Sequence, residues 1–147
     1  MSNIDVMKSG LAAFEARDSK KIDSLFADDM VFAGPVPQPI GKHEFVGLQS
    51  ALIAAMPDWK FNASDFKEDG DKVTAKAHIS GTQSAPLSLP ALGIQSFAGT
   101  GKHVQLPYET LTATIKNGKV TRLEAAHVEG GGVPGVLAQL GAKMPTP

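Results

Sequence analysis

The hydrophobic positions in the first 57 residues recur at the 3.6-residue spacing of amphipathic helices. An extended run and the proline-rich stretch GPVPQPIG at 34–41 interrupt this pattern. We therefore expect a helix capped by Asn3, a second capped by Asp18, and a third that begins after Gly41 and ends at Pro57. The apolar faces of these helices hold Ile4, Met7, Leu11 and Phe14; Ile22, Leu25 and Phe26; and Phe45, Leu48, Leu52 and Ala55.

Downstream of these helices the spacing changes to the alternation that is typical of β-strands. Two strands are predicted around 59–63 and 73–79, and two more at about 103–115 and 120–128, on either side of the turn sequence KNGK. Helices followed by a meander of strands predict an α+β fold, in which helices pack on one face of a curved antiparallel sheet. The length of the chain favours a single domain over residues 1–147.

The last hairpin has two possible registers, which differ in the side chains that face the helices. A two-residue turn at 117–118 would bury Arg122 and Glu124. A three-residue turn, with a bulge at the glycine of that turn, would leave both charged side chains in water. We favour the second register because burying the two charges would be costly. It points inward the side chains of Leu123, Ala125 and His127.

Composition narrows the range of partners. The formal net charge is −1 and no run of basic residues occurs, so we expect no nucleic-acid partner. The absence of cysteine excludes disulfides and thiolate metal sites. The N-terminal sequence lacks the apolar segment of a signal peptide, and the longest apolar run, ALIAAM, is too short to span a bilayer. We therefore expect a cytoplasmic protein with no membrane partner.

Between about residues 8 and 145, five stretches follow one another: LFADDMVFAGPVPQPIGKHEF, AAMPDWKF, ISGTQSAPLSLP, TGKHVQLPYETLTATIKNGKV and GGVPGVLAQLG. Their order resembles that of the SnoaL-like polyketide cyclases, within the nuclear-transport-factor-2-like superfamily. The resemblance implies a cone-shaped curved antiparallel sheet wrapped around N-terminal helices, a pocket at the wide end, and a homodimer formed through the sheet. It also implies cofactor-free chemistry, because the best-known members close polyketide rings; relatives include isomerases, epoxide hydrolases, dehydratases and members without catalysis.

Two positions depart from the family's catalytic pattern. Gln83 stands where the cyclases usually have a histidine, and Leu111 stands where their catalytic aspartate aligns. Glu109 lies two residues before Leu111 on the same strand face, so it is the natural substitute carboxylate. Burial in an apolar pocket would raise its pKa toward the range useful for abstracting a proton next to a carbonyl. The alternative is a strand-end glutamate at the pocket rim, in water or bonded to backbone.

Two further polar residues are candidates for the site. In the favoured register His127 shares the face of Glu109 and would relay a proton or bond a substrate oxygen, unless it is satisfied by backbone at the strand end. Gln83 would donate a hydrogen bond to an oxyanion or, equally, anchor a loop.

Trp59, Phe61 and Leu111 are expected to form the pocket wall that receives a flat ring, although aromatic residues on a buried face are more often plain core. We expect no metal and no cofactor. The histidines without a partner at metal-ligand spacing are His43, His78 and His103.

The C-terminal stretch begins with three glycines at 130–132, which permit a sharp turn away from the last strand. Pro134 then suits the first turn of a short apolar helix that Gly141 would end. A helix this short persists only when docked on apolar surface. We expect residues 134–141 to cover the pocket mouth as a lid, together with the Pro- and Gly-rich loop 84–103; the alternative is a helix that merely plugs the core.

Two functions remain open from the sequence. One is a cofactor-free cyclase or isomerase that acts on a small hydrophobic carbonyl compound, with Glu109 and His127 as acid and base. The other is a non-catalytic module of the same fold that binds a small molecule or a protein.

Overall fold

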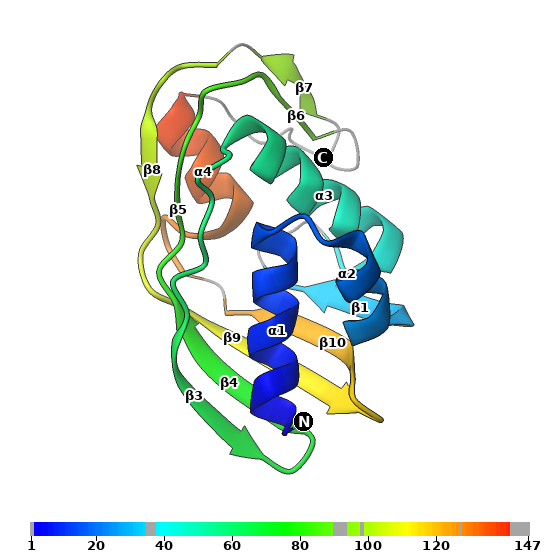
Figure 1. Ribbon diagram of the computed structural model, residues 1–147. Coiled ribbons are helices and arrows are strands. Elements are labelled where there is room, and N and C mark those ends of the chain that lie inside the picture. Colours follow the sequence, from blue (N-terminus) through cyan, green and yellow to red (C-terminus); the bar gives the residue numbers. More distant parts are fainter. Residues whose placement is uncertain (1, 35–37, 90–93, 98, 127, 142–147) are drawn as a thin grey trace.

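The computed structural model describes residues 2–34, 38–89, 94–97, 99–126 and 128–141 (Figure 1). The helices are α1 (Asn3–Glu15), α2 (Ser19–Leu25), α3 (Lys42–Ala55) and α4 (Gly132–Leu140). The strands are β1 (Phe26–Ala33), β2 (Ile40–Gly41), β3 (Ser64–Asp69), β4 (Lys72–Ala77), β5 (Ser80–Thr82), β6 (Leu87–Leu89), β7 (Ile94–Phe97), β8 (His103–Gln105), β9 (Glu109–Lys116) and β10 (Lys119–Ala125). Within the described ranges, no helix is long and apolar enough to cross a membrane.

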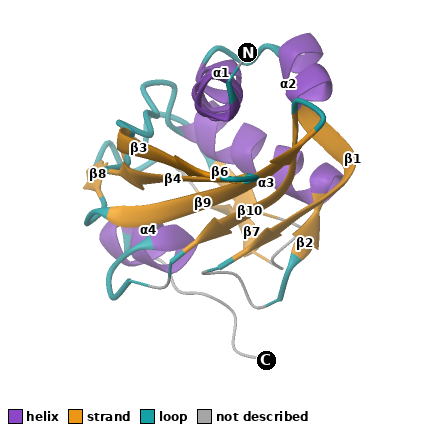
Figure 2. Cartoon of the chain, turned by 90° about the horizontal axis from the view of Figure 1, so that it is seen from below, coloured by secondary structure: helices purple, strands orange, loops and turns teal. Residues whose placement is uncertain are grey.

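The main sheet has six strands in the order β2-β1-β10-β9-β4-β3. Every pair is antiparallel except β1 and β10, which run parallel. Figure 2 shows these strands as one curved layer, with α1 and α2 against one side. The pairs β5–β8 and β6–β7 extend beyond this sheet toward α3 and α4 (Figure 1). The predicted α+β fold, with a curved sheet around N-terminal helices and a short C-terminal helix, is confirmed.

Helix starts follow local capping. The cap of α1 is Ser2, not Asn3 as predicted, because the Ser2 hydroxyl accepts from the Asp5 backbone N–H while the Asp5 carboxylate accepts from the Ser2 backbone N–H. Asp18 caps α2 as predicted, through the Lys21 N–H. A buried aromatic cluster joins α1, β1 and α3; its rings are Phe14, Phe26, Phe32 and Phe45.

Two of the predicted strands are wrong in detail. Residues 59–63 form no strand; a single backbone bridge joins Lys60 to Ser80, and Asn62 has a positive φ of 48° that interrupts any regular ladder. The predicted strand 103–115 is two strands, β8 and β9, because Pro107 between them has no N–H for a ladder.

In the hairpin β9–β10 the inward and outward residues are as predicted, but the turn and the bulge differ from the prediction. The turn has two residues, Asn117 and Gly118, with φ of 54° and 75°, which suits the twist of the strands. A bulge at Thr121 then shifts the register between Val120 and Arg122. The charged side chains Arg122 and Glu124 consequently face outward, where they pair with each other, and the apolar side chains turned inward are Leu123 and Ala125.

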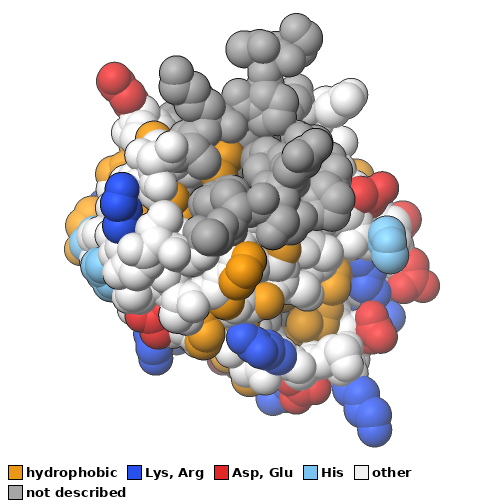
Figure 3. Space-filling model, turned by 90° about the horizontal axis from the view of Figure 1, so that it is seen from above, with side chains coloured by type: hydrophobic (Ala, Val, Ile, Leu, Met, Phe, Trp, Pro, Cys, Tyr) orange, Lys and Arg blue, Asp and Glu red, His pale blue; other side chains and the backbone are white. Residues whose placement is uncertain are grey.

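One end of the molecule carries scattered charges. Figure 3 views the end that holds α4, β6 and β7; around its border, acidic and basic side chains alternate with apolar ones. The visible described part of this face therefore has no concentrated patch of one sign.

Deleting single residues of β10 tests the bulge. Without Thr121 the ladder becomes regular and keeps Leu123 inside. We therefore expect the free energy of unfolding to fall by only about 1 kcal/mol, because the hydrogen bond from the Thr121 hydroxyl to the Thr114 carbonyl is lost. Deleting Leu123 instead turns a charged side chain of β10 inward, whether the bulge is kept or lost. We expect this deletion to lower the free energy of unfolding by at least about 3 kcal/mol. Thermal unfolding followed by circular dichroism measures both; equal losses would contradict the register.

Candidate functional site

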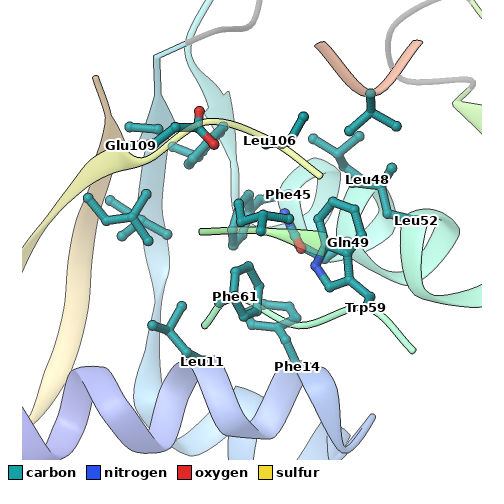
Figure 4. Close-up of a pocket in the computed structure, with 16 residues that line it drawn as sticks. Leu11, Phe14, Phe45, Leu48, Gln49, Leu52, Trp59, Phe61, Leu106 and Glu109 are labelled. Atoms are coloured by element: carbon teal, nitrogen blue, oxygen red, sulfur yellow. The ribbon is translucent and has the colours of Figure 1, made fainter. Parts of the chain in front are cut away.

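An apolar cavity lies between α1, α3, the inner face of the sheet and α4 (Figure 4). Its volume is about 60 Å³, smaller than the cavity of about 150 Å³ that holds benzene. The described residues that line it are Leu11, Phe14, Phe32, Phe45, Leu48, Gln49, Leu52, Trp59, Phe61, Ile79, Leu106, Glu109, Leu111, Leu123, Ala125 and Val136. Among these, Glu109 is the only ionisable residue.

Glu109 is the first residue of β9, opposite Ala77 of β4. Its side chain enters the cavity from the strand and is 2% exposed (Figure 4). The alternation of β9 gives Glu109, Leu111 and Ala113 the same inward face. Glu109 therefore lies in the wall, and the alternative of a solvent-exposed rim position is wrong.

The glycine run brings the start of α4 against the Glu109 carboxylate. A Cβ on Gly131, the residue that caps α4, would lie 2.9 Å from Glu109 Oε1. Gly135 is equally constrained, because its Cβ would lie 2.1 Å from the Gly130 carbonyl oxygen. The start of α4 therefore packs directly against the Glu109 carboxylate.

Helix α4 is docked by apolar and polar contacts. Val136 and Leu137 are buried, as is Leu140, and Val136 forms part of the cavity wall. Gln139 holds the helix to β8 with a pair of hydrogen bonds: its Oε1 accepts from the Gln105 N–H at 2.9 Å, and its Nε2 donates to the Gln105 carbonyl at 2.8 Å. Helix α4 thus closes the cavity on one side.

The aromatic wall is positioned by an irregular but anchored segment. The Thr82 N–H donates to Asp58 Oδ1 at 2.6 Å, a bond that lowers the pKa of the Asp58 carboxyl. The Phe61 N–H donates to Glu15 Oε2 at 3.0 Å. The Trp59 and Phe61 rings meet edge to face, with 6.3 Å between centroids. Trp59 and Phe61 therefore line the cavity together with Leu111, as the sequence predicts.

Two other sequence candidates stand apart from this group. Gln83 does not line the cavity; its Oε1 accepts from the Thr100 N–H and hydroxyl, so the amide anchors the adjoining loop. His127 lies outside the described residues, and so does part of the 84–103 loop. In the described part of the chain, no three His, Asp or Glu side chains are grouped as metal ligands would be.

Sequence reasoning missed Gln49, a polar residue of α3 that lines the cavity and is 7% exposed. The signal was available, because Gln49 follows Phe45 by four residues on the buried stripe of the helix. Its Oε1 and the Trp59 Nε1 are both buried without a hydrogen-bond partner in the described structure.

The family model for the SnoaL-like domain matches residues 8–123. The chain belongs to the SnoaL-like family. No curated protein matches it.

Solved structures share the fold of this SnoaL-like chain at low sequence identity. IdmH of Streptomyces antibioticus, a candidate polyketide cyclase, is 19% identical, with a TM-score of 0.72 over 97% of this chain and 100% of that one. AclR of Streptomyces galilaeus, a candidate hydroxylase, is also 19% identical, with a TM-score of 0.72 over 99% and 88%. TerC, crystallised with polyporic acid, is 20% identical, with a TM-score of 0.60 over 84% and 88%. The reaction must therefore be argued from the residues of the cavity.

Replacing Gly131 with alanine tests the packing of α4 on Glu109. The φ of Gly131 is −103°, which any residue adopts, so the effect of G131A reports the steric contact alone. We expect the free energy of unfolding to fall by about 1–3 kcal/mol. The matched control is G47A in α3, where no atom lies within 4 Å of the added Cβ and alanine should be neutral or stabilising by about 0.5–1 kcal/mol. Equal melting temperatures for the two variants would contradict the contact.

Proposed function

We propose that this protein binds a small hydrophobic carbonyl compound in its cavity and acts on it as a cofactor-free isomerase or cyclase, with Glu109 as the proton-transferring group. The observation that supports this most is the placement of one buried carboxylate in a wall that is otherwise apolar except for Gln49 and the Trp59 indole. Family membership supports the same class of chemistry.

The proposed step is abstraction of a proton from the carbon next to the substrate carbonyl. The pair of electrons left by the C–H bond forms the enolate, and the proton moves to a Glu109 oxygen. Return of that proton to another carbon gives an isomer. In ring closure the enolate carbon attacks a second carbonyl carbon, the C=O π pair moves to its oxygen, and that oxygen takes the proton back from Glu109. An apolar cavity favours the transfer because water does not compete for the carboxylate.

Leu111 occupies the position of the family's catalytic aspartate and is part of the apolar wall. Glu109 supplies a carboxylate one step further along the same inward face of β9, beside α4. The proton-transferring group of this protein is therefore at position 109 and not at position 111. His127 stays a candidate for its proton relay.

The size of the cavity limits the ligand. A volume of about 60 Å³ is smaller than the cavity of about 150 Å³ that holds benzene, so even a single small ring needs a wall to move. Helix α4 is the element suited to such movement, since Gly130 beside its start has a positive φ of 80° and no atom lies within 4 Å of a Cβ built on it. TerC, which was crystallised with polyporic acid, supports ligand binding within this fold.

A non-catalytic ligand-binding module is the second candidate. It is favoured by the replacement of two family catalytic positions by Leu111 and Gln83, neither of which transfers a proton at neutral pH.

Proton exchange on cyclohexanone separates the two candidates. The α-hydrogens of this ketone exchange with deuterated water, and NMR measures the rate. We expect the protein to accelerate exchange and E109Q, which keeps the shape of the side chain, to lower that acceleration about 10²–10⁴-fold. Amide chemical shifts measure binding of the ketone in both proteins. Binding without acceleration in the natural sequence would support the non-catalytic candidate, and absence of binding would contradict both.

We further propose a homodimer formed through the outer face of the sheet. Thr110, Thr112 and Thr114 alternate with the buried residues of β9 and offer a flat β-branched surface. Light scattering at micromolar concentration is expected to give the mass of two chains, and T112R, which puts a charge at the centre of this surface, the mass of one. A monomer for the natural sequence would overturn this proposal.

A further inference from the structure

Two polar groups on the cavity wall lack partners. Gln49 Oε1 is an acceptor and Trp59 Nε1 a donor; their residues are 7% and 4% exposed, and neither atom has a hydrogen bond in the described structure. Both residues line the same cavity, on the side away from Glu109 (Figure 4). A donor and an acceptor thus lie beside the space that a ligand would fill.

Buried polar atoms without partners are uncommon, since each destabilises the fold by about 1–3 kcal/mol. A leucine or methionine at position 49 would complete the apolar face of α3 without that penalty. The polar atoms therefore indicate a ligand that bonds to them.

The indole is held firmly. The Trp59 backbone N–H donates to the Met56 carbonyl at 2.8 Å, and a Cβ on Gly81 would lie 3.3 Å from Trp59 Cε3 and 3.0 Å from Met56 Cβ. The ring therefore packs on the backbone at Gly81 and keeps its orientation. A fixed donor recognises a ligand without loss of side-chain freedom on binding.

We propose that Gln49 and Trp59 form a hydroxyl-binding subsite, which rests on the proposed ligand-binding function of the cavity. A hydroxyl donates its hydrogen to Gln49 Oε1 and accepts from the indole N–H of Trp59, so one small group satisfies both atoms. A carbonyl oxygen satisfies only the indole. A hydroxyl also fits the reversed orientation of the Gln49 amide, because its oxygen accepts two hydrogen bonds.

The subsite and Glu109 together indicate which groups the ligand carries at its two ends. Phe45, Phe61 and Leu106 line the space between the subsite and Glu109 (Figure 4). The ligand class is therefore a small ring compound with a hydroxyl at one end and its reacting carbon at the other, beside Glu109.

Phenol and toluene test the subsite, because they differ by a hydroxyl in place of a methyl group. Their dissociation constants are measured by amide NMR titration for the natural sequence, Q49M and W59F. We expect each variant to raise the ratio of the phenol constant to the toluene constant about five- to tenfold, through loss of one hydrogen bond. The matched control is Q83M, which removes a buried amide outside the cavity and should leave the ratio unchanged even where it lowers the melting temperature.

The outcomes separate the two proposals. A raised ratio in Q49M and W59F, with Q83M unchanged, supports the subsite. An unchanged ratio in both variants overturns it while toluene binding leaves the proposed cavity function standing. A natural sequence that binds toluene and excludes phenol also overturns the subsite. Binding of neither compound overturns both proposals.

Discussion

The packing of the glycine-rich start of α4 against the Glu109 carboxylate is the constraint on which the cavity depends. A carboxylate in an apolar wall is unfavourable without polar surroundings. The start of α4 approaches it closely because Gly131 has no side chain to collide with Glu109 Oε1. The same approach brings Val136 into the wall. One local contact therefore fixes the position of the carboxylate and the closure of the cavity.

Much of this arrangement could be predicted from the sequence. The 3.6-residue spacing of Leu11 and Phe14 predicted the inner face of α1. Desolvation of charge correctly predicted that Arg122 faces outward, whereas the predicted three-residue turn was wrong. The position of the bulge was not predictable in the same way, because a bulge at Thr121 and a bulge at the turn leave the same residues inside. Periodicity carries information about faces, whereas the position of a bulge depends on tertiary packing.

The limits of prediction at the site also have physical causes. The segment that holds Trp59 alternates like a strand but is fixed by side chains, including Asp58, whose bond partner at Thr82 is distant in sequence. Gln49 was missed because a polar residue is not expected on the buried face of α3, although its spacing from Phe45 places it on that face. The fold is shared with proteins named for different activities, so the residues that differ between them must decide the chemistry. In this wall Leu111 is apolar, and Glu109, on the same face of β9, is the only ionisable side chain among the described residues that line the cavity.

The central claim is that a small carbonyl compound occupies this cavity with its reacting carbon at Glu109. Intermolecular nuclear Overhauser effects between cyclohexanone and the protein test it most directly. The account predicts contacts from the ring hydrogens to the methyl groups of Leu111, Leu123 and Val136, which line the cavity from three different elements. Contacts confined to methyl groups outside the cavity, with none to these three residues, would contradict it.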